Sequence, residues 1–189
     1  MDFELKRELK ELLAGERGYY RYPMGTRTPF ALVYPNSYFV GMSNLGLHIV
    51  YELLNERDDV ACERVFLPER KEIKRYENTR TPLMSIENQT PLYEFPLIGF
   101  VLSFEMDYFN VLQMLELGKV KVKAADRGDK DPLVIAGGPC ATFNPEPLSG
   151  VVDAFIIGEG EVVMPALIDA WNEAKRQGLN RQELLRSLA

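Results

Sequence analysis

Reactive and metal-binding side chains are scarce in this sequence, which has two cysteines, Cys62 and Cys140, and one histidine, His48. Two thiols far apart along the chain cannot build a disulfide framework or a multi-cysteine metal site, and one imidazole cannot build a histidine-rich metal site. Long apolar runs are missing as well: none approaches the roughly 20 residues that cross a bilayer, and residues 1–10 lack the apolar core of a secretion signal. We therefore predict a cytoplasmic protein with no membrane partner.

The sequence also has a deficit of positive charge: 22 Lys and Arg residues face 28 Asp and Glu residues, for a formal net charge of -6. A surface that binds nucleic acid normally carries a dense positive face. The basic cluster at residues 70–75 is interrupted by acids and is typical of a solvated helix face. The charge balance therefore excludes nucleic acid as a general partner.

What is present is the material for one globular domain, since 46% of the 189 residues are hydrophobic. From Phe30 onward, short apolar runs alternate with helical patterns, which is typical of a parallel sheet covered by helices. We predict an α/β fold with a Rossmann-like open parallel sheet of about five strands, helices on both faces and an N-terminal helical arm. The predicted strands lie in the segments FALVY, VACERVFLP, LIGFVLS, PLVIAGG and VVDAFIIGEGE.

Short polar residues mark where the predicted helices begin, because their side chains can accept hydrogen bonds from the first free backbone N–H groups. The predicted N-caps are Asp2, Ser43, Asp107 and Asn180, the last in capping-box spacing with Glu183. A polar stretch at 69–94 is predicted to hold one short helix.

Ligands of open parallel sheets bind beyond the carboxyl ends of the strands, where the strand order reverses. This rule selects the loops PNSYFVGMSN, SFEMD, GGPCATFNPEP and GEGE, which we expect to converge in space. The first strand is not followed by G-x-G-x-x-G, and no phosphate-binding loop with Lys and Ser or Thr occurs. The usual nicotinamide and P-loop nucleotide sites are therefore excluded.

Each strand-end loop also has a purely structural interpretation. Ser103 can hydrogen-bond a ligand, but serine is a common turn residue. The double glycine at 137–138 permits a close approach of backbone to a ligand, or only a tight turn. The acids near 159 and 161 can accept hydrogen bonds from a ligand, or simply favour the start of a helix.

Cys140 raises the hypothesis of a thiol nucleophile, because a thiol near a helix start can have a lowered pKa. The required base is missing, since the only histidine, His48, falls inside a predicted helix. A buried structural cysteine is the favoured interpretation.

The loops GGPCATFNPEP and IIGEGE, spaced as consecutive strand ends, resemble the N-terminal cobalamin-binding-like domain of radical S-adenosylmethionine enzymes. In that family a G-G-P-H-A-x-x-x-P-E-like loop precedes a G-E-G-E loop. The segment LVYPNSYFVGMSNLGLHIVYELL is similar to the family's opening strand and helix, with Gly46 and Leu47 at its recurrent G-L. The resemblance runs from about Phe30 to Gly178 and is closest to an uncharacterised branch.

The resemblance implies a Rossmann-like domain that holds cobalamin at the carboxyl ends of its strands. The residues that it places around the nucleotide tail of cobalamin are Ser103, Gly137, Gly138, Pro139, Gly158, Glu159 and Gly160. The backbone of the double glycine would then line that tail.

Two motifs of related enzymes are absent from this sequence. The D-x-H-x-x-G signature, whose histidine coordinates cobalt from below, does not occur, so no lower histidine ligand is expected. The C-x-x-x-C-x-x-C motif that holds the iron-sulfur cluster is also missing. Without three closely spaced thiolates this chain cannot hold the cluster, so S-adenosylmethionine and the 4Fe-4S cluster are expected only in a parent protein.

These observations lead to one main functional prediction. We expect a helix and connector at 1–29, a cobalamin-binding-like domain at 30–178, and at 179–189 the start of a linker helix toward a catalytic domain. The chain is predicted to be an accessory domain that binds cobalamin or shapes the substrate entrance, without turnover of its own. Its expected partner is the radical barrel domain of the same protein. The alternatives are a degenerate domain that only docks on the barrel, and a thiol enzyme that uses Cys140.

Overall fold

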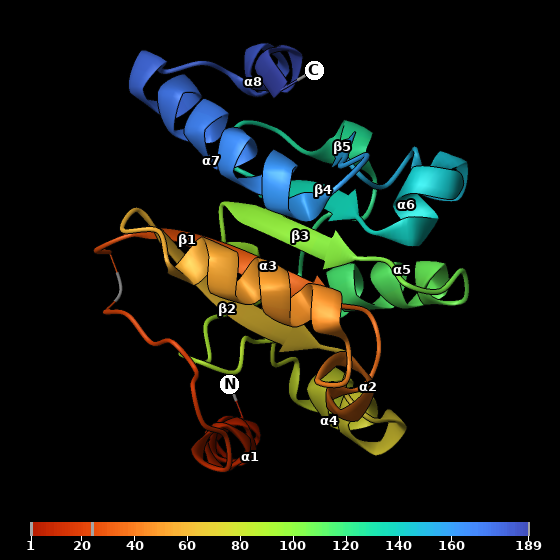
Figure 1. Ribbon diagram of the computed structural model, residues 1–189. Coiled ribbons are helices and arrows are strands. Elements are labelled where there is room, and N and C mark those ends of the chain that lie inside the picture. The colour runs from red at the N-terminus through yellow and green to blue at the C-terminus, as the bar shows by residue number, and fades with distance from the viewer. Residues whose placement is uncertain (1, 24, 189) are drawn as a thin grey trace.

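The computed structural model describes residues 2–23 and 25–188. A five-stranded parallel sheet lies at the centre of the fold, with the strand order β2-β1-β3-β4-β5 (Figure 1). The strands are β1 Thr28–Tyr34, β2 Val60–Phe66, β3 Leu97–Val101, β4 Leu133–Gly137 and β5 Ala154–Phe155. The predicted Rossmann-like α/β fold is therefore confirmed.

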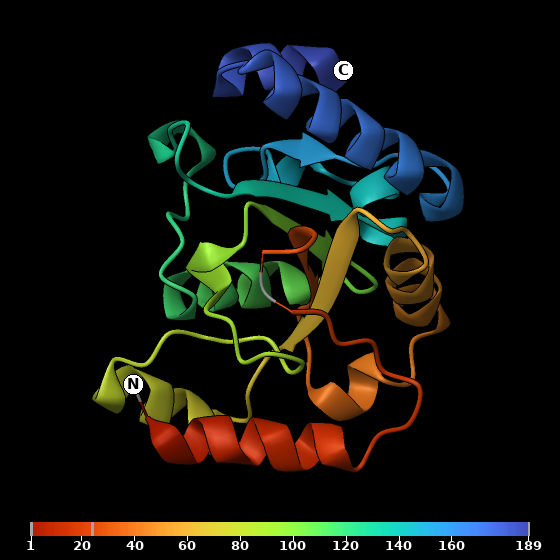
Figure 2. The same cartoon turned by 90° about the vertical axis from the view of Figure 1, so that its left-hand side faces the viewer.

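Helices connect the strands and surround the sheet. They are α1 Phe3–Ala14, α2 Tyr38–Gly41, α3 Leu45–Asn55, α4 Arg70–Thr79, α5 Asp107–Leu117, α6 Pro139–Phe143, α7 Gly160–Gln177 and α8 Arg181–Leu188, with short 3-10 helices η1 Leu92–Glu94, η2 Ala124–Asp126 and η3 Glu146–Leu148. Helices α1 and α4 lie at one end of the molecule, and α7 and α8 lie at the other (Figure 2). Within residues 2–23 and 25–188, no helix has the length and apolar character needed to span a membrane.

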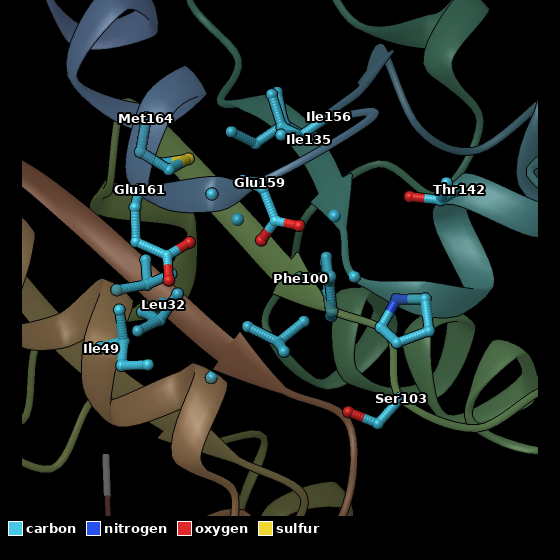
Figure 3. A pocket seen from close by; sticks show the side chains of 18 of the residues that line it. Leu32, Ile49, Phe100, Ser103, Ile135, Thr142, Ile156, Glu159, Glu161 and Met164 are labelled. Carbon is cyan, nitrogen blue, oxygen red and sulfur yellow. The ribbon is translucent and has the colours of Figure 1, made fainter.

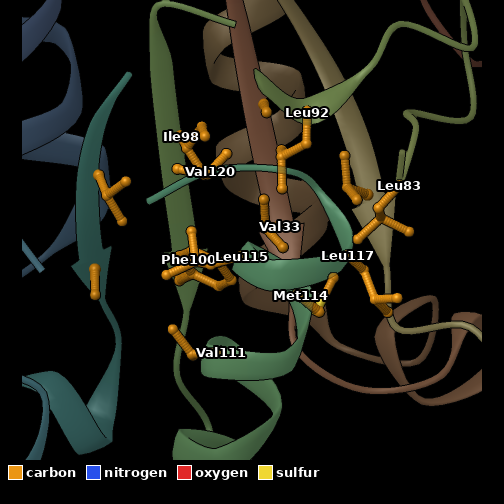
Figure 4. Packing of buried hydrophobic residues seen from close by; sticks show 14 of the residues in the cluster. Val33, Leu83, Leu92, Ile98, Phe100, Val111, Met114, Leu115, Leu117 and Val120 are labelled. Carbon is orange, nitrogen blue, oxygen red and sulfur yellow. The ribbon is translucent and has the colours of Figure 1, made fainter. Parts of the chain in front are cut away.

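Helices cover both faces of the sheet, and successive side chains of a strand point to opposite faces. Phe30 and Leu32 of β1 pack in a core with α3 and α7. Ala31 and Val33 pack in a second core with α5, where Val33 lies near Met114 (Figure 4). Continuous apolar strands are what such a doubly covered parallel sheet requires.

Two of the predicted N-caps are confirmed by hydrogen bonds. The Asp2 carboxylate accepts from the backbone N–H groups of the first turn of α1. Asn180 and Glu183 form the predicted reciprocal capping box, in which each backbone N–H donates to the other side chain, at 2.9 and 3.1 Å.

The other two cap predictions are wrong by one residue. The chain forms the short helix α2 before α3, which leaves Asn44 rather than Ser43 in the extended conformation of an N-cap. The Asn44 side chain accepts from Leu47 N–H at 2.9 Å, and the Ser43 hydroxyl donates to Phe39 O instead. Helix α5 has Met106 at its cap position, so Asp107 becomes its first helical residue.

The predicted polar connector between β2 and β3 contains α4 as expected, but residues 81–87 after it are buried. Glu87 in this segment is fully buried and forms an ion pair with Arg64 of β2, with 2.7 Å from Arg64 Nε to Glu87 Oε1. The same guanidinium reaches Glu16 at 2.8 Å. One buried arginine thus joins the sheet to this segment and to the chain that follows α1.

Helix α8 is attached to the amino-terminal side of β4. Arg181 donates to the carboxylate of Asp153 at 2.6 Å and to the carbonyl oxygen of Pro132 at 3.0 Å. Leu184 of the same helix is buried in the core with α7. These contacts make α8 part of the packed domain.

Candidate functional site

The strand order reverses between β1 and β3, because β2 lies on one side of β1 and β3 on the other. The loops after these two strands therefore separate at the sheet edge, where open parallel sheets bind their ligands. Asn44 joins the two loops, since its side-chain amide donates to Ser103 Oγ at 3.2 Å and to the Tyr34 hydroxyl at 3.5 Å.

A cavity of about 510 Å³ opens at this edge and extends between the sheet and the helices α3 and α7 (Figure 3). Its inner walls are apolar. Leu32 and Ile135 of the strands line it together with Ile49 of α3 and Met164 of α7. Its size lies within the range of roughly 300–1,000 Å³ that is usual for small-molecule pockets.

The residues selected from the sequence all line this cavity, although they come from separate loops. They are Ser103 after β3, Gly137, Gly138 and Pro139 after β4, and Gly158, Glu159 and Gly160 after β5. The first strand-end loop contributes Asn44. The four loops chosen by the strand-end rule are thus brought together at one place.

The double glycine has a structural reason that does not depend on a ligand. Gly138 has φ of +101°, and a β-carbon there would lie 2.7 Å from the carbonyl oxygen of Leu102. That carbonyl accepts from Cys140 N–H, and Leu102 N–H donates to Gly137 O at 2.8 Å. The turn is therefore locked against the loop after β3, and only glycine can occupy position 138 without strain.

Gly158 differs from Gly138 in its surroundings. Its φ is +113°, but a β-carbon there would meet nothing within 4 Å. This glycine serves the turn into α7 and leaves open space at the mouth of the cavity.

The polar groups of the cavity are mostly free to bind a ligand. Figure 3 shows the carboxylates of Glu159 and Glu161 pointing into the cavity. Neither carboxylate, nor the Thr142 hydroxyl, has a hydrogen-bond or ion-pair partner among the described residues. Ser103 accepts from Asn44 and keeps its own hydroxyl proton for an acceptor. No lysine, arginine or histidine within residues 2–23 and 25–188 lines the cavity.

Asp107 lies beside the cavity and not in it. Its side chain is only 1% exposed, and Oδ1 accepts from the side-chain amides of Asn36 at 3.1 Å and Asn110 at 3.4 Å. Oδ2 has no partner within the described residues. Burial raises the pKa of this carboxyl, and the two amides oppose the rise. Asp107 therefore holds the loop after β1 against α5.

The geometry does not support a thiol nucleophile. Cys140 is buried, and its burial, with further contributions from the charges of Glu105 and Asp107, raises the pKa of the thiol. His48 does not line the cavity; its Nε2 lies 2.9 Å from the carbonyl oxygen of Met42. The thiol therefore lacks both a lowered pKa and a base.

Sequence reasoning missed several lining residues. The sequence prediction places the cap at Ser43 and gives Asn44 no role, although the place of Asn44 in the loop after β1 is a usable signal. Thr142 lies within a loop that was selected, but a lone threonine carries no pattern. Ile49 and Met164 were indistinguishable from other apolar helix residues that pack in the core.

Comparison with known proteins agrees with the sequence motifs. A family model described as radical SAM proteins, N-terminal, matches residues 46–189. The uncharacterized protein MJ0966 of Methanocaldococcus jannaschii is 28% identical over 131 residues. The aligned part covers 69% of this chain but only 24% of that protein, so the chain spans about a quarter of the length of this relative. No solved structure matches the chain.

Proposed function

This chain belongs to the family of N-terminal domains of radical SAM proteins, and we propose that it is a binding module which presents cobalamin to the rest of such a protein. The observation that carries the proposal is the convergence of four strand-end loops on one cavity at the switch point of the sheet. The bound group would lie where open α/β sheets place their ligands.

The cavity fits the nucleotide tail of cobalamin and not the whole cofactor. Its walls at Leu32, Ile49, Ile135 and Met164 are apolar, as a flat heteroaromatic base requires. A volume of about 510 Å³ accommodates a base with its sugar, and the larger corrin ring would remain outside.

The polar residues of this chain would hold the tail and the edge of the ring. Ser103 can donate to a sugar oxygen, and Thr142 can donate or accept. Glu159 and Glu161 can accept from the amide side chains that surround a corrin. Cobalamin, when bound, supplies a cobalt atom that can carry a methyl group. No histidine lines the cavity in the described part of the chain, so the residues present offer no imidazole to the cobalt.

The proposal is tested by titrating the purified chain with hydroxocobalamin and methylcobalamin, followed by visible absorbance and calorimetry. Ile49→Trp fills the cavity from helix α3 and should abolish saturable binding. Glu52→Trp is the matched control, because Glu52 is exposed on the same helix and does not line the cavity. Absence of binding to the native chain at millimolar cobalamin, an affinity worth only about 4 kcal/mol, would refute the proposal.

A second candidate function, docking without a cofactor, is favoured by a separate observation. Several large apolar side chains that follow the carboxyl ends of the strands are exposed: Phe39, Phe104, Met106, Phe109, Phe143 and Val162. Exposed apolar side chains gathered on one side of a domain mark an interaction surface. The proposed partner is the radical SAM portion of the same protein.

Docking is tested with that portion supplied as a separate chain. Replacing Phe104 and Phe143 by serine should weaken co-elution of the two parts, whereas replacing the exposed Phe3 of α1 should not. Equal effects at both places would contradict a docking surface at the strand ends. Docking that persists without any cobalamin binding would favour this second function over the first.

A further inference from the structure

The free charges that face the cavity are all negative. Glu159 and Glu161 point into it without partners, and no cationic side chain among the described residues lines it. Pockets built for phosphate normally supply arginine or lysine, or a nest of backbone N–H groups. Glycine turns at 137–138 and 158–160 line this cavity, but its described lining holds two carboxylates and no cationic side chain. The cavity therefore has the apolar walls of a nucleoside site and a charge opposite to that of a phosphate site.

The N-terminus of α7 lies beside these carboxylates, and its helix dipole opposes their negative charge. A helix N-terminus carries about half a positive charge and attracts anions. Glu159 at the cap position and Glu161 in the first turn together carry up to two negative charges. Their sum exceeds the dipole, so the local field favours neutral or cationic groups.

We propose that the cavity selects a nucleoside-like ligand, with a flat base and a hydroxylated sugar, and rejects ligands that end in a free phosphate. This inference rests on the proposed function in one respect: the nucleoside used to test it carries the same base as the cobalamin tail. The phosphate of the cobalamin tail is a diester with one negative charge, and the ring joined to it would lie outside the cavity. A terminal phosphate carries close to two negative charges, and both carboxylates would repel it.

The experiment compares α-ribazole, the dimethylbenzimidazole nucleoside, with α-ribazole 5′-phosphate by calorimetry on the whole chain. At low salt the phosphate compound should bind roughly tenfold more weakly than the nucleoside, because the two carboxylates repel the phosphate through partly solvated surroundings. About 0.5 M salt should reduce the ratio of the two dissociation constants, because salt screens this repulsion. Glu159→Gln combined with Glu161→Gln should bring the two affinities together. Glu52→Gln, which removes an exposed carboxylate that does not line the cavity, should leave the ratio unchanged.

The outcomes separate this inference from the proposed function. Equal or tighter binding of the phosphate, or a ratio that the double substitution leaves unchanged, would overturn the charge selection. Failure of both probes to bind at millimolar concentration would overturn the nucleoside site, even if cobalamin binds. Discrimination between the probes without any cobalamin binding would support the inference and refute the cobalamin proposal.

Discussion

The buried ion pair between Arg64 and Glu87 predicts a large loss of stability for the substitution Glu87→Gln. Both side chains are almost fully removed from solvent, at 2% and 0% exposure. Glu87 accepts from Arg64 Nε through one oxygen and from Arg64 backbone N–H through the other, each at 2.7 Å. An amide keeps the shape of the carboxylate, but its NH2 group must face one of these donors.

The expected loss is about 3 kcal/mol in the free energy of unfolding. Removing one partner of a buried pair typically costs roughly 3–5 kcal/mol, since the other charge stays buried. Glu16 still pairs with Arg64 at 2.8 Å, which places the estimate at the lower end. For a chain of this size the loss corresponds to a fall in Tm of about 6–12 °C.

The assay is urea unfolding followed by the fluorescence of Trp171, the single tryptophan, which is buried on α7. The control is the triple substitution Arg64→Met, Glu87→Leu and Glu16→Gln, which removes all three charges of the cluster and should recover at least half of the loss. A Glu87→Gln variant within 1 kcal/mol of the native chain, or a triple variant no more stable than the single one, would refute the reasoning.

Three further predictions concern the surroundings of the cavity. Gly138→Ala should lower the free energy of unfolding by about 2 kcal/mol, measured by urea unfolding, because its β-carbon would press on Leu102 O at 2.7 Å; an unchanged midpoint would contradict a locked turn. Asp107→Asn should stabilise the chain at pH 7. Burial raises the pKa of Asp107, so its cost appears as the pH rises above the ordinary value of 3.8 and is absent below it; thermal unfolding from pH 3 to 7 should show the gain disappearing at low pH, and a gain independent of pH would contradict the reasoning. The Cys140 thiol should react with iodoacetamide more slowly in the folded chain than in urea at pH 8, because its pKa is raised by burial; mass spectrometry that shows the opposite order would restore the nucleophile hypothesis.

The fold was predictable because the signals for it are local and repeated. Apolar strands that alternate with capped helices admit few arrangements other than an open parallel sheet. The strand-end rule then located the cavity from sequence alone, since parallel strands bring their carboxyl ends to one edge. Ser103, residues 137–139 and residues 158–160, which all line the cavity, followed from that rule and from the family motifs.

What the sequence could not supply depends on contacts between distant segments. Glu87 is a charged residue, and its burial depends on the pairing with Arg64, 23 residues away in the sequence. The cap of α3 moved from Ser43 to Asn44 because α2 occupies the preceding residues. Position 138 requires glycine because a β-carbon there would meet Leu102, which belongs to another loop.

Asn44 performs two tasks with one side chain, and this has a consequence for hydrogen exchange. Its oxygen fixes the amide of Leu47 in the first turn of α3, while its nitrogen donates to Ser103 at the cavity. A ligand that accepts the Ser103 proton would polarise the whole chain of hydrogen bonds and strengthen the cap. The exchange rate of the Leu47 amide should then slow when the cavity is filled, so that a single backbone proton on the helix reports occupancy at the strand ends.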